Sequence, residues 1–182
     1  MKLRIQKIVE YALAPNGEKL ENRSMKIYHL VRSQKLPITQ DVAWAFFANP
    51  ANLLQLTPPW AKMSDESPDK PKQIYSGQLQ ILHMQVPMGL PGHWLAMITH
   101  VEEPEYFIDV QQSGPFRFWH HRHQIIPIEG GVEVRDTIQY AMPFGFLGTI
   151  AHNLFVRNQL QELFDYRHHV LEDFFGAFHS AS

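Results

Sequence analysis

Two histidines separated by a single residue are the side chains of this sequence most suited to chemistry. His121 and His123 follow Trp119 at alternate positions, and Asp136 and Tyr140 come shortly afterwards in the chain. Alternate side chains of a β-strand point to the same face of a sheet, so we expect Trp119, His121 and His123 to lie side by side. Imidazole and carboxylate groups can orient a polar ligand, transfer protons or bind a metal ion.

The segment around Asp136 predicts the face on which its carboxylate lies. Apolar residues alternate there with polar residues, the pattern of a strand with one solvated face. The apolar set is Val132, Val134, Ile138 and Tyr140, and the polar set is Glu133, Arg135, Thr137 and Gln139. Asp136 falls on the apolar face, where an unpaired carboxylate would be costly. A turn at Gly130-Gly131 would bring His121 or His123 within its reach.

These observations predict one polar cluster on the inner face of a sheet. Its members are Trp119, His121, His123, Asp136 and Tyr140. Two interpretations remain open at this point. Either the cluster contacts a ligand and orients its polar end, or it is a hydrogen-bonded structural network that fixes the register of the strands.

The sequence favours neither a metal centre nor a nucleophilic enzyme. His121 and His123 provide two potential metal ligands and Asp136 a third, but no further ligand follows at a fixed spacing. Cysteine is absent, and no Gly-x-Ser-x-Gly turn occurs. We therefore predict no metal and no cofactor and assign no catalytic residue. Acid-base chemistry by the cluster is the reaction type left open.

The composition describes one globular domain without the charge that binding to nucleic acid requires. The chain has 182 residues, of which 45% are hydrophobic and 19% charged, and its formal net charge is −2 at pH 7. The absence of a dense Lys and Arg stripe argues against a nucleic-acid partner. The sequence contains neither an apolar run long enough to span a membrane nor a secretory signal, so we expect a cytoplasmic protein. A homodimer is left open.

Periodicity and turn residues predict the elements that position the cluster. A first strand is expected over residues 25–36, followed by two short helices, the first capped by Thr39 and the second opened by Asn49-Pro50. A polar loop is expected from Ser64 to Lys72. Five more strands are expected, over residues 73–86, 93–102, 106–113, 116–127 and 132–142.

A single long helix is expected at the C-terminal end. It runs from Leu147 to about Phe178 and contains no Gly or Pro between Gly148 and Gly176. Its apolar stripe consists of Ile150, Leu154, Leu160, Leu163, Phe164, Leu171, Phe174, Phe175 and Phe178. Such a helix is long enough to cross a curved sheet.

Several short sequence motifs resemble those of a known superfamily. They are Asn49-Pro50-Ala51-Asn52-Leu53, Leu56-Thr57-Pro58-Pro59, Gly114-Pro115-Phe116 with Trp119, His121 and His123, then Asp136, Tyr140 and Pro143, and finally Phe164-Asp165-Tyr166-Arg167. With residues 1–24 set apart as an N-terminal extension, the domain at residues 25–178 resembles bacterial START-like (SRPBCC) proteins of the polyketide cyclase-like or ligand-binding kind. The resemblance implies an α+β helix-grip fold, in which a curved antiparallel β-sheet wraps around a long C-terminal α-helix and two short helices follow the first strand.

The resemblance implies a choice of functions, because one fold carries many. We expect the binding of a hydrophobic or aromatic small molecule, or of a lipid, in an internal cavity between the sheet and the C-terminal helix, without catalysis. The alternative is a polyketide cyclase-like or dehydratase-like enzyme that uses the His, Asp and Tyr side chains of the cluster as acids and bases. A third alternative is a closed domain that serves as an interaction module.

Overall fold

Seven antiparallel strands form the sheet of the computed structural model, which describes residues 25–86 and 90–179. The strands are β1 (Tyr28–Leu36), β2 (Ser64–Asp65), β3 (Leu79–Val86), β4 (Leu90–Glu102), β5 (Tyr106–Ser113), β6 (Phe118–Ile128) and β7 (Gly131–Ala141). Their order across the open sheet is β1-β7-β6-β5-β4-β3-β2, so the first and last long strands are neighbours. Residues 1–24, expected as an N-terminal extension, lie outside the described residues.

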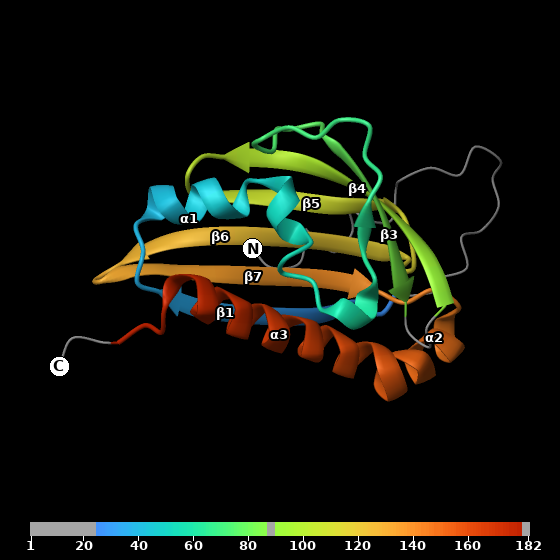
Figure 1. The fold of residues 1–182 in the computed structure, drawn as a ribbon. Coiled ribbons are helices and arrows are strands. Elements are labelled where there is room, and N and C mark those ends of the chain that lie inside the picture. Colours follow the sequence, from blue (N-terminus) through green and yellow to red (C-terminus); the bar gives the residue numbers. More distant parts are fainter. Residues whose placement is uncertain (1–24, 87–89, 180–182) are drawn as a thin grey trace, which may run out of the picture.

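Helices cover one face of this sheet. After β1 come α1 (Gln40–Phe47) and two short 3-10 helices, η2 (Pro50–Leu53) and η3 (Pro59–Ala61). The C-terminal segment consists of α2 (Gly145–Ala151), the π-helical turn η5 (His152–Val156) and α3 (Arg157–Phe175). Figure 1 shows α3 running lengthwise beside β1 and β7, with α1 next to β6 on the left of the view. This arrangement confirms the predicted α+β helix-grip architecture.

Local capping explains where the first helices begin. The Thr39 side chain accepts a hydrogen bond from the backbone N–H of Val42 at 3.4 Å, as the sequence predicts. The Asn49 side chain accepts one from the N–H of Ala51 at 3.1 Å, and Pro50 fits the first helical position, where no N–H is needed. The second predicted helix is therefore present, in 3-10 form.

Two apolar clusters join the helices to the sheet. The first lies under α1 and includes Leu36, Ala43, Trp44, Phe107, Ile125, Val132, Val134 and Leu171. The second consists of Trp119, Ile138, Tyr140, Val156 and Phe164. Both contain residues of β6 or β7 and of the C-terminal helix, which shows that the helix is held by the inner face of the sheet.

The C-terminal helix differs from the single helix that the sequence predicts. It ends at Phe175, because Gly176 adopts a φ of 85°, and the π turn η5 interrupts it. A π turn accommodates an additional residue and so changes the face that the residues before it present. Ile150 and Leu154, which we expected in the buried stripe, are exposed.

An exposed apolar patch results at the start of this segment. It consists of Phe144, Phe146, Leu147, Ile150, Leu154 and Phe155. Phe144 and Phe146 are 83% and 78% exposed, and Phe144 adopts a φ of 62°, in the left-handed region that disfavours residues with a Cβ atom. Not one charged residue lies between Met142 and Val156.

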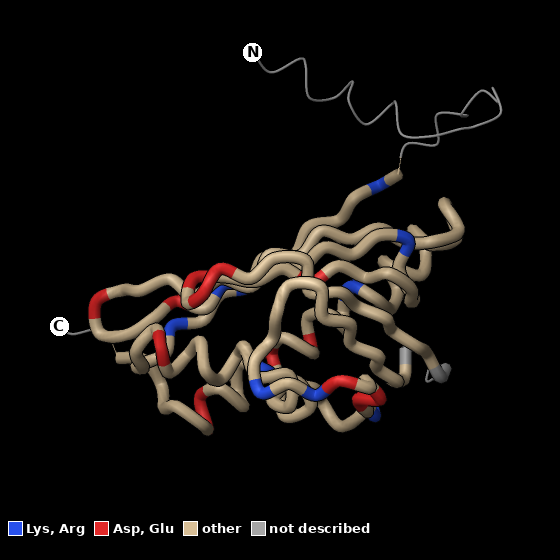
Figure 2. The backbone as a smooth tube through the Cα atoms, turned by 90° about the horizontal axis from the view of Figure 1, so that it is seen from above, with Lys and Arg blue, Asp and Glu red and all other residues tan. Residues whose placement is uncertain are grey.

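Charged residues are spread over the described chain without a basic surface. Figure 2 shows Lys and Arg on several elements rather than gathered on one, with Asp and Glu among them. None of the helices in residues 25–86 and 90–179 is both long enough and apolar enough to cross a bilayer.

Candidate functional site

The register of three neighbouring strands brings four ionisable side chains together. In the β6–β7 pair His123 lies opposite Asp136, and in the β5–β6 pair His121 lies opposite Asp109. The turn between β6 and β7 sets the first pairing: Gly130 has a φ of 80°, and a Cβ atom on Gly131 would collide with the backbone of Leu36. The predicted alternation of β7 is confirmed, since Asp136 is only 8% exposed.

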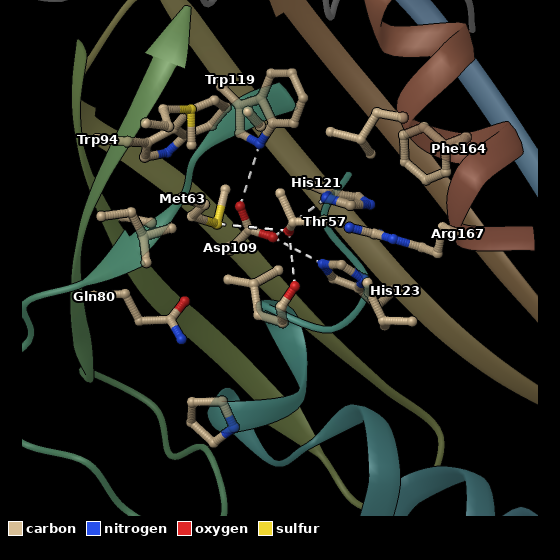
Figure 3. A pocket seen from close by; sticks show the side chains of 18 of the residues that line it. Thr57, Met63, Gln80, Trp94, Asp109, Trp119, His121, His123, Phe164 and Arg167 are labelled. Atoms are coloured by element: carbon tan, nitrogen blue, oxygen red, sulfur yellow. Dashed lines mark hydrogen bonds and ion pairs between the residues drawn. The ribbon is translucent and has the colours of Figure 1, made fainter. Parts of the chain in front are cut away.

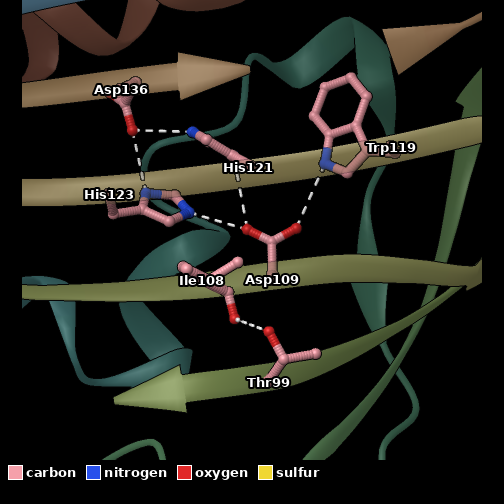
Figure 4. Close-up of polar contacts among 7 residues, drawn as sticks. All are labelled: Thr99, Ile108, Asp109, Trp119, His121, His123 and Asp136. Carbon is pink, nitrogen blue, oxygen red and sulfur yellow. Dashed lines mark hydrogen bonds and ion pairs between the residues drawn. The ribbon is translucent and has the colours of Figure 1, made fainter. Parts of the chain in front are cut away.

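We call Asp109, His121, His123 and Asp136 the polar cluster (Figure 4). His123 lies between two carboxylates, with Nε2 2.8 Å from Oδ2 of Asp109 and Nδ1 2.9 Å from Oδ1 of Asp136. His121 bridges the same pair, with Nε2 2.9 Å from Oδ1 of Asp136 and Nδ1 3.4 Å from Oδ2 of Asp109. Trp119 completes the network by donating its indole N–H to Oδ1 of Asp109 at 3.2 Å. Each carboxylate is therefore held by at least two ring groups.

The environment gives the two carboxylates low pKa values. Burial alone would raise the pKa of Asp109, but the charge of His121 and the hydrogen bond with His123 outweigh it and hold that pKa below its usual range. Burial is likewise outweighed at Asp136, whose pKa is lowered by its hydrogen bonds with His121 and His123. Both groups are carboxylates at neutral pH.

The two histidines have pKa values shifted in opposite directions. Burial, followed by the charge of His123, lowers the pKa of His121. At His123 burial is outweighed by the hydrogen bonds with Asp109 and Asp136, which raise its pKa. His123, with both ring nitrogens close to carboxylate oxygens, is therefore the more readily protonated of the two histidines, and His121 is the less readily protonated.

A fifth ionisable group reaches the polar cluster from the helix. Figure 3 shows Arg167 extending from α3 toward His121 and His123. Its guanidinium lies over the Phe164 ring, 4.9 Å from the ring centroid, and burial lowers its pKa without removing its charge. When His123 is protonated, it and Arg167 balance the charges of the two carboxylates.

The polar cluster forms part of the wall of a cavity of about 210 Å³ (Figure 3). Asp109, Trp119, His121, His123 and Arg167 face it from the sheet and α3. Most of the remaining wall is apolar and includes Phe46, Leu53, Leu56, Met63, Leu82, Trp94, Ile98, Phe116, Leu160 and Leu163. Such a cavity can hold an apolar body and offer hydrogen bonds at one place only.

The predicted site residues take different positions around this cavity. Trp119, His121 and His123 line it, whereas Asp136 lies behind the histidines and faces a smaller cavity of about 70 Å³. Tyr140 packs in the second apolar cluster, and its hydroxyl lies 2.8 Å from Nε2 of His152. Burial, with a contribution from Tyr28, raises the pKa of Tyr140 to about 12. The structure thus joins Asp136 to the histidines and pairs Tyr140 with a different histidine.

Asp109 and Arg167 are the site residues that the sequence argument missed. Alternation starting at Phe107, which is buried, places Asp109 on the inner face, but the strand lacks the regular apolar pattern of β7. Arg167 follows Leu163 and Phe164 at helical spacing and so shares their face. The alternation in β5 and the helical spacing in α3 can both be read from the sequence, but each indicates a site residue less clearly than the His-x-His pair does.

Asp109, His121 and His123 also form a potential metal-binding set. One ligand atom from each lies within 4.8 Å of the other two. The third ligand would be Asp109 rather than Asp136, the one that the sequence suggests. The imidazole rings, however, are tilted by 36° with centroids 3.7 Å apart, and their ring nitrogens already form hydrogen bonds with the carboxylates. A metal ion would have to displace those protons, so a metal-free site remains our prediction.

Comparison with known proteins concerns the fold. No protein-family model and no curated protein matches this sequence. Norcoclaurine synthase from Thalictrum flavum, solved in complex with dopamine and hydroxybenzaldehyde, is similar with a TM-score of 0.61 and 15% identity over 93% of this chain and 98% of its own. A START superfamily protein from Mycobacterium smegmatis is similar with a TM-score of 0.61 and 12% identity over 80% of this chain and 98% of its own. A protein from Thermus thermophilus is similar with a TM-score of 0.61 and 16% identity over 80% of this chain and 95% of its own.

Proposed function

From the START-like helix-grip fold that this chain shares with those structures, we propose that the protein binds a hydrophobic or aromatic small molecule in the cavity between its sheet and its C-terminal helix, without catalysing a reaction. One observation carries the proposal. The cavity is apolar over most of its wall, and its charged side chains are gathered at one place. A ligand with an apolar body and one polar end matches this distribution.

The size of the cavity limits the ligand. Its volume of about 210 Å³ is below the roughly 300–1,000 Å³ of sites for drug-sized molecules. We therefore expect a compact molecule with one or two rings, or a short aliphatic chain. The synthase solved with dopamine and hydroxybenzaldehyde supports the proposal only in this respect: a protein of this fold is known in complex with small aromatic molecules.

An acid-base enzyme of the cyclase or dehydratase kind is the second candidate. It is favoured by the position of His121, an imidazole with a lowered pKa on the cavity wall, which lies between the carboxylates of Asp109 and Asp136. Such an imidazole can accept a proton, because the carboxylates stabilise the resulting cation. Binding requires only a cavity that fits the ligand, whereas catalysis also requires acid-base groups positioned at the reacting atoms. Binding is therefore the function we propose first.

Native mass spectrometry of the protein purified from its own host tests the proposal. We expect a small molecule to co-purify and to be released unchanged from the folded protein. Leu82→Trp, which fills the cavity from β3, should abolish the bound mass, whereas Val31→Trp, at an exposed position of β1, should keep it. Time-dependent conversion of the released molecule would favour the enzyme. Absence of any bound molecule, together with no binding from a panel of small apolar compounds, would contradict both.

A further inference from the structure

Resting on the proposed binding function, we propose that the ligand carries a carboxylate and that Arg167 is the residue that binds it. The ligand class is therefore a compact carboxylic acid with an apolar body. The argument depends on the contacts of the guanidinium, on those of the neighbouring carboxylates and on the charge balance of the cavity wall.

Arg167 is a cation whose side chain passes an apolar stretch of the cavity wall to reach the polar cluster. Among the described residues that line the cavity, it is the sole Lys or Arg. The adjoining turns of α3 contribute Leu160, Leu163 and Phe164 to the same wall. A permanent charge in such surroundings is costly unless a hydrogen-bonded counter-ion accompanies it.

No hydrogen-bonded partner accompanies this guanidinium within residues 25–86 and 90–179. Its Nε atom is buried and makes no hydrogen bond, and no carboxylate oxygen there lies within ion-pair distance of its nitrogen atoms. Phe164 contacts the face of the guanidinium and does not satisfy the buried Nε–H. A carboxylate is the group that fits two parallel N–H donors, so an acidic ligand would supply the missing partner.

Three of the four carboxylate oxygens of the polar cluster are paired with residues other than Arg167. Oδ1 of Asp136 receives both histidines, and the two oxygens of Asp109 receive Trp119 and the histidines. They lower the energy of the Arg167 charge at longer range without bonding to it. The hydrogen-bonding capacity of Arg167 therefore remains for a ligand.

The charge balance of the site predicts that binding of an acidic ligand is coupled to proton uptake. With His123 protonated, the charges of Asp109, Asp136, His123 and Arg167 cancel, so a bound carboxylate would leave an excess negative charge. His121 can compensate it by taking up a proton, because Asp109 on β5 and Asp136 on β7 favour its charged form, while His123 on β6 and Arg167 on α3 oppose it. Binding of an acid should therefore take up as much as one proton from solution, and binding of a neutral analogue should take up none.

Two matched probes test the inference, 2-naphthoic acid and 2-naphthalenemethanol, which differ at the polar group. Their affinities can be measured by calorimetry, with the emission of Trp94 and Trp119 on the cavity wall as a second signal. We expect the acid to bind at least about tenfold more tightly than the alcohol, as a charge-assisted pair would produce. Calorimetry in buffers of different ionisation enthalpy should show proton uptake for the acid alone.

Variants of Arg167 identify the residue responsible. In Arg167→Gln the preference for the acid should fall to within about twofold while the alcohol keeps its affinity, and in Arg167→Lys part of the preference should remain. Arg157→Gln, an exposed position on the same helix, is the control and should keep the wild-type ratio. Circular dichroism establishes that each variant is folded.

The outcomes separate this inference from the function on which it rests. Equal affinities of acid and alcohol in the wild-type protein would overturn the carboxylate inference and leave the binding function intact, whether or not the variants fold. An undiminished preference in folded Arg167→Gln would also overturn it. Binding of neither probe would contradict the inference and the proposed function together.

Discussion

At the scale of single residues, the polar cluster depends on a carboxylate oxygen that two imidazoles share. Oδ1 of Asp136 lies 2.9 Å from Nε2 of His121 and 2.9 Å from Nδ1 of His123. Because His121 and Asp136 are buried and His123 is mostly so, water replaces a lost partner poorly. The interaction network is therefore also a structural feature, whichever ligand the cavity holds.

We expect Asp136→Asn to lower the free energy of unfolding by about 3–5 kcal/mol, because it removes one partner of a buried charged network. Urea-induced unfolding measures the change. Asp165→Asn is the control: Asp165 pairs with Arg32 at 3.1 Å but is largely exposed, so its loss should cost less than about 1 kcal/mol. An unchanged stability of Asp136→Asn would mean that the carboxylate is solvated, with the register of β7 shifted by one residue.

The shifted pKa values predict how stability depends on pH. The lowered pKa values of Asp109 and Asp136 contribute stability above their unfolded pKa of about 3.9, and that stability is lost as the pH falls through the folded values. The lowered pKa of His121 acts in the same direction near its unfolded value of about 6.5. The raised pKa of His123 contributes stability below about 6.5 that is lost as the pH rises through its folded value.

We therefore expect the free energy of unfolding to rise with pH from acid to near neutrality and then to decline as His123 loses its proton. Denaturant unfolding at a series of pH values up to about 9, below the titration of Tyr140, measures both limbs. His123→Gln should abolish the decline above neutrality, and His100→Gln, at an exposed position of β4, should keep it. A decline that persists in His123→Gln would assign it to another group.

The members of the polar cluster could be predicted from the sequence where the alternation of apolar and polar residues along a strand is regular. β7 alternates without a break, so the inward direction of Asp136 and its proximity to His123 followed directly. β5 has polar residues on both faces after Val110, which concealed Asp109. Arg167 could not be placed because its distance from the sheet depends on how α3 packs, and a spacing within the helix contains no such information.

At the scale of elements, Phe144 combines a strained backbone with an exposed ring. Its φ of 62° begins α2, and its side chain contributes little to the core. We expect Phe144→Gly to raise the free energy of unfolding by about 1 kcal/mol, because glycine adopts this conformation without steric cost. Thermal unfolding by calorimetry measures the effect.

Phe146→Gly is the matched control, because Phe146 is equally exposed but lies within α2. There glycine should lower the free energy of unfolding by about 0.5–1 kcal/mol, through its poor helix propensity. Destabilisation by Phe144→Gly would show that the Phe144 ring stabilises the fold enough to outweigh the backbone strain.

The observed boundaries of helices and strands differ from the predicted ones where the backbone conformation, and not the side-chain pattern, determines them. The strand expected from Gln73 begins at Leu79, because Gly77 adopts a φ of 93° and the chain turns there. Ser64 and Asp65, expected in a polar loop, pair with β3 and form a short edge strand that no apolar pattern marks. Hydrophobic periodicity predicts which face a residue occupies better than where pairing starts.

At the scale of the whole molecule, the helix is held to the sheet by few buried side chains. Leu171 of α3 is 3% exposed and packs in the cluster that also contains Trp44 and Val132. We expect Leu171→Ala to lower the free energy of unfolding by about 2–5 kcal/mol, as for other buried leucines. Phe174, also expected in the buried stripe, is 49% exposed, so Phe174→Ala should cost clearly less. Equal losses in urea unfolding would mean that the opposite face of α3 contacts the sheet.

The π turn η5 has a consequence for changes in chain length. The wider turn absorbs one additional residue, so the α-helical portions on either side keep the angular relation of an uninterrupted helix that is one residue shorter. Deleting one residue of the turn, such as Asn153, should therefore restore a regular α-helix without rotating either portion. Inserting a further residue after Asn158, in α3, would instead rotate the portion beyond it by about 100°. His152, bonded to Tyr140, and Arg167, in the cavity wall, lie on opposite sides of both changes. Only the deletion lets both keep their positions, so the anchoring of the helix and the composition of the cavity wall tolerate a shorter segment here but not a longer one.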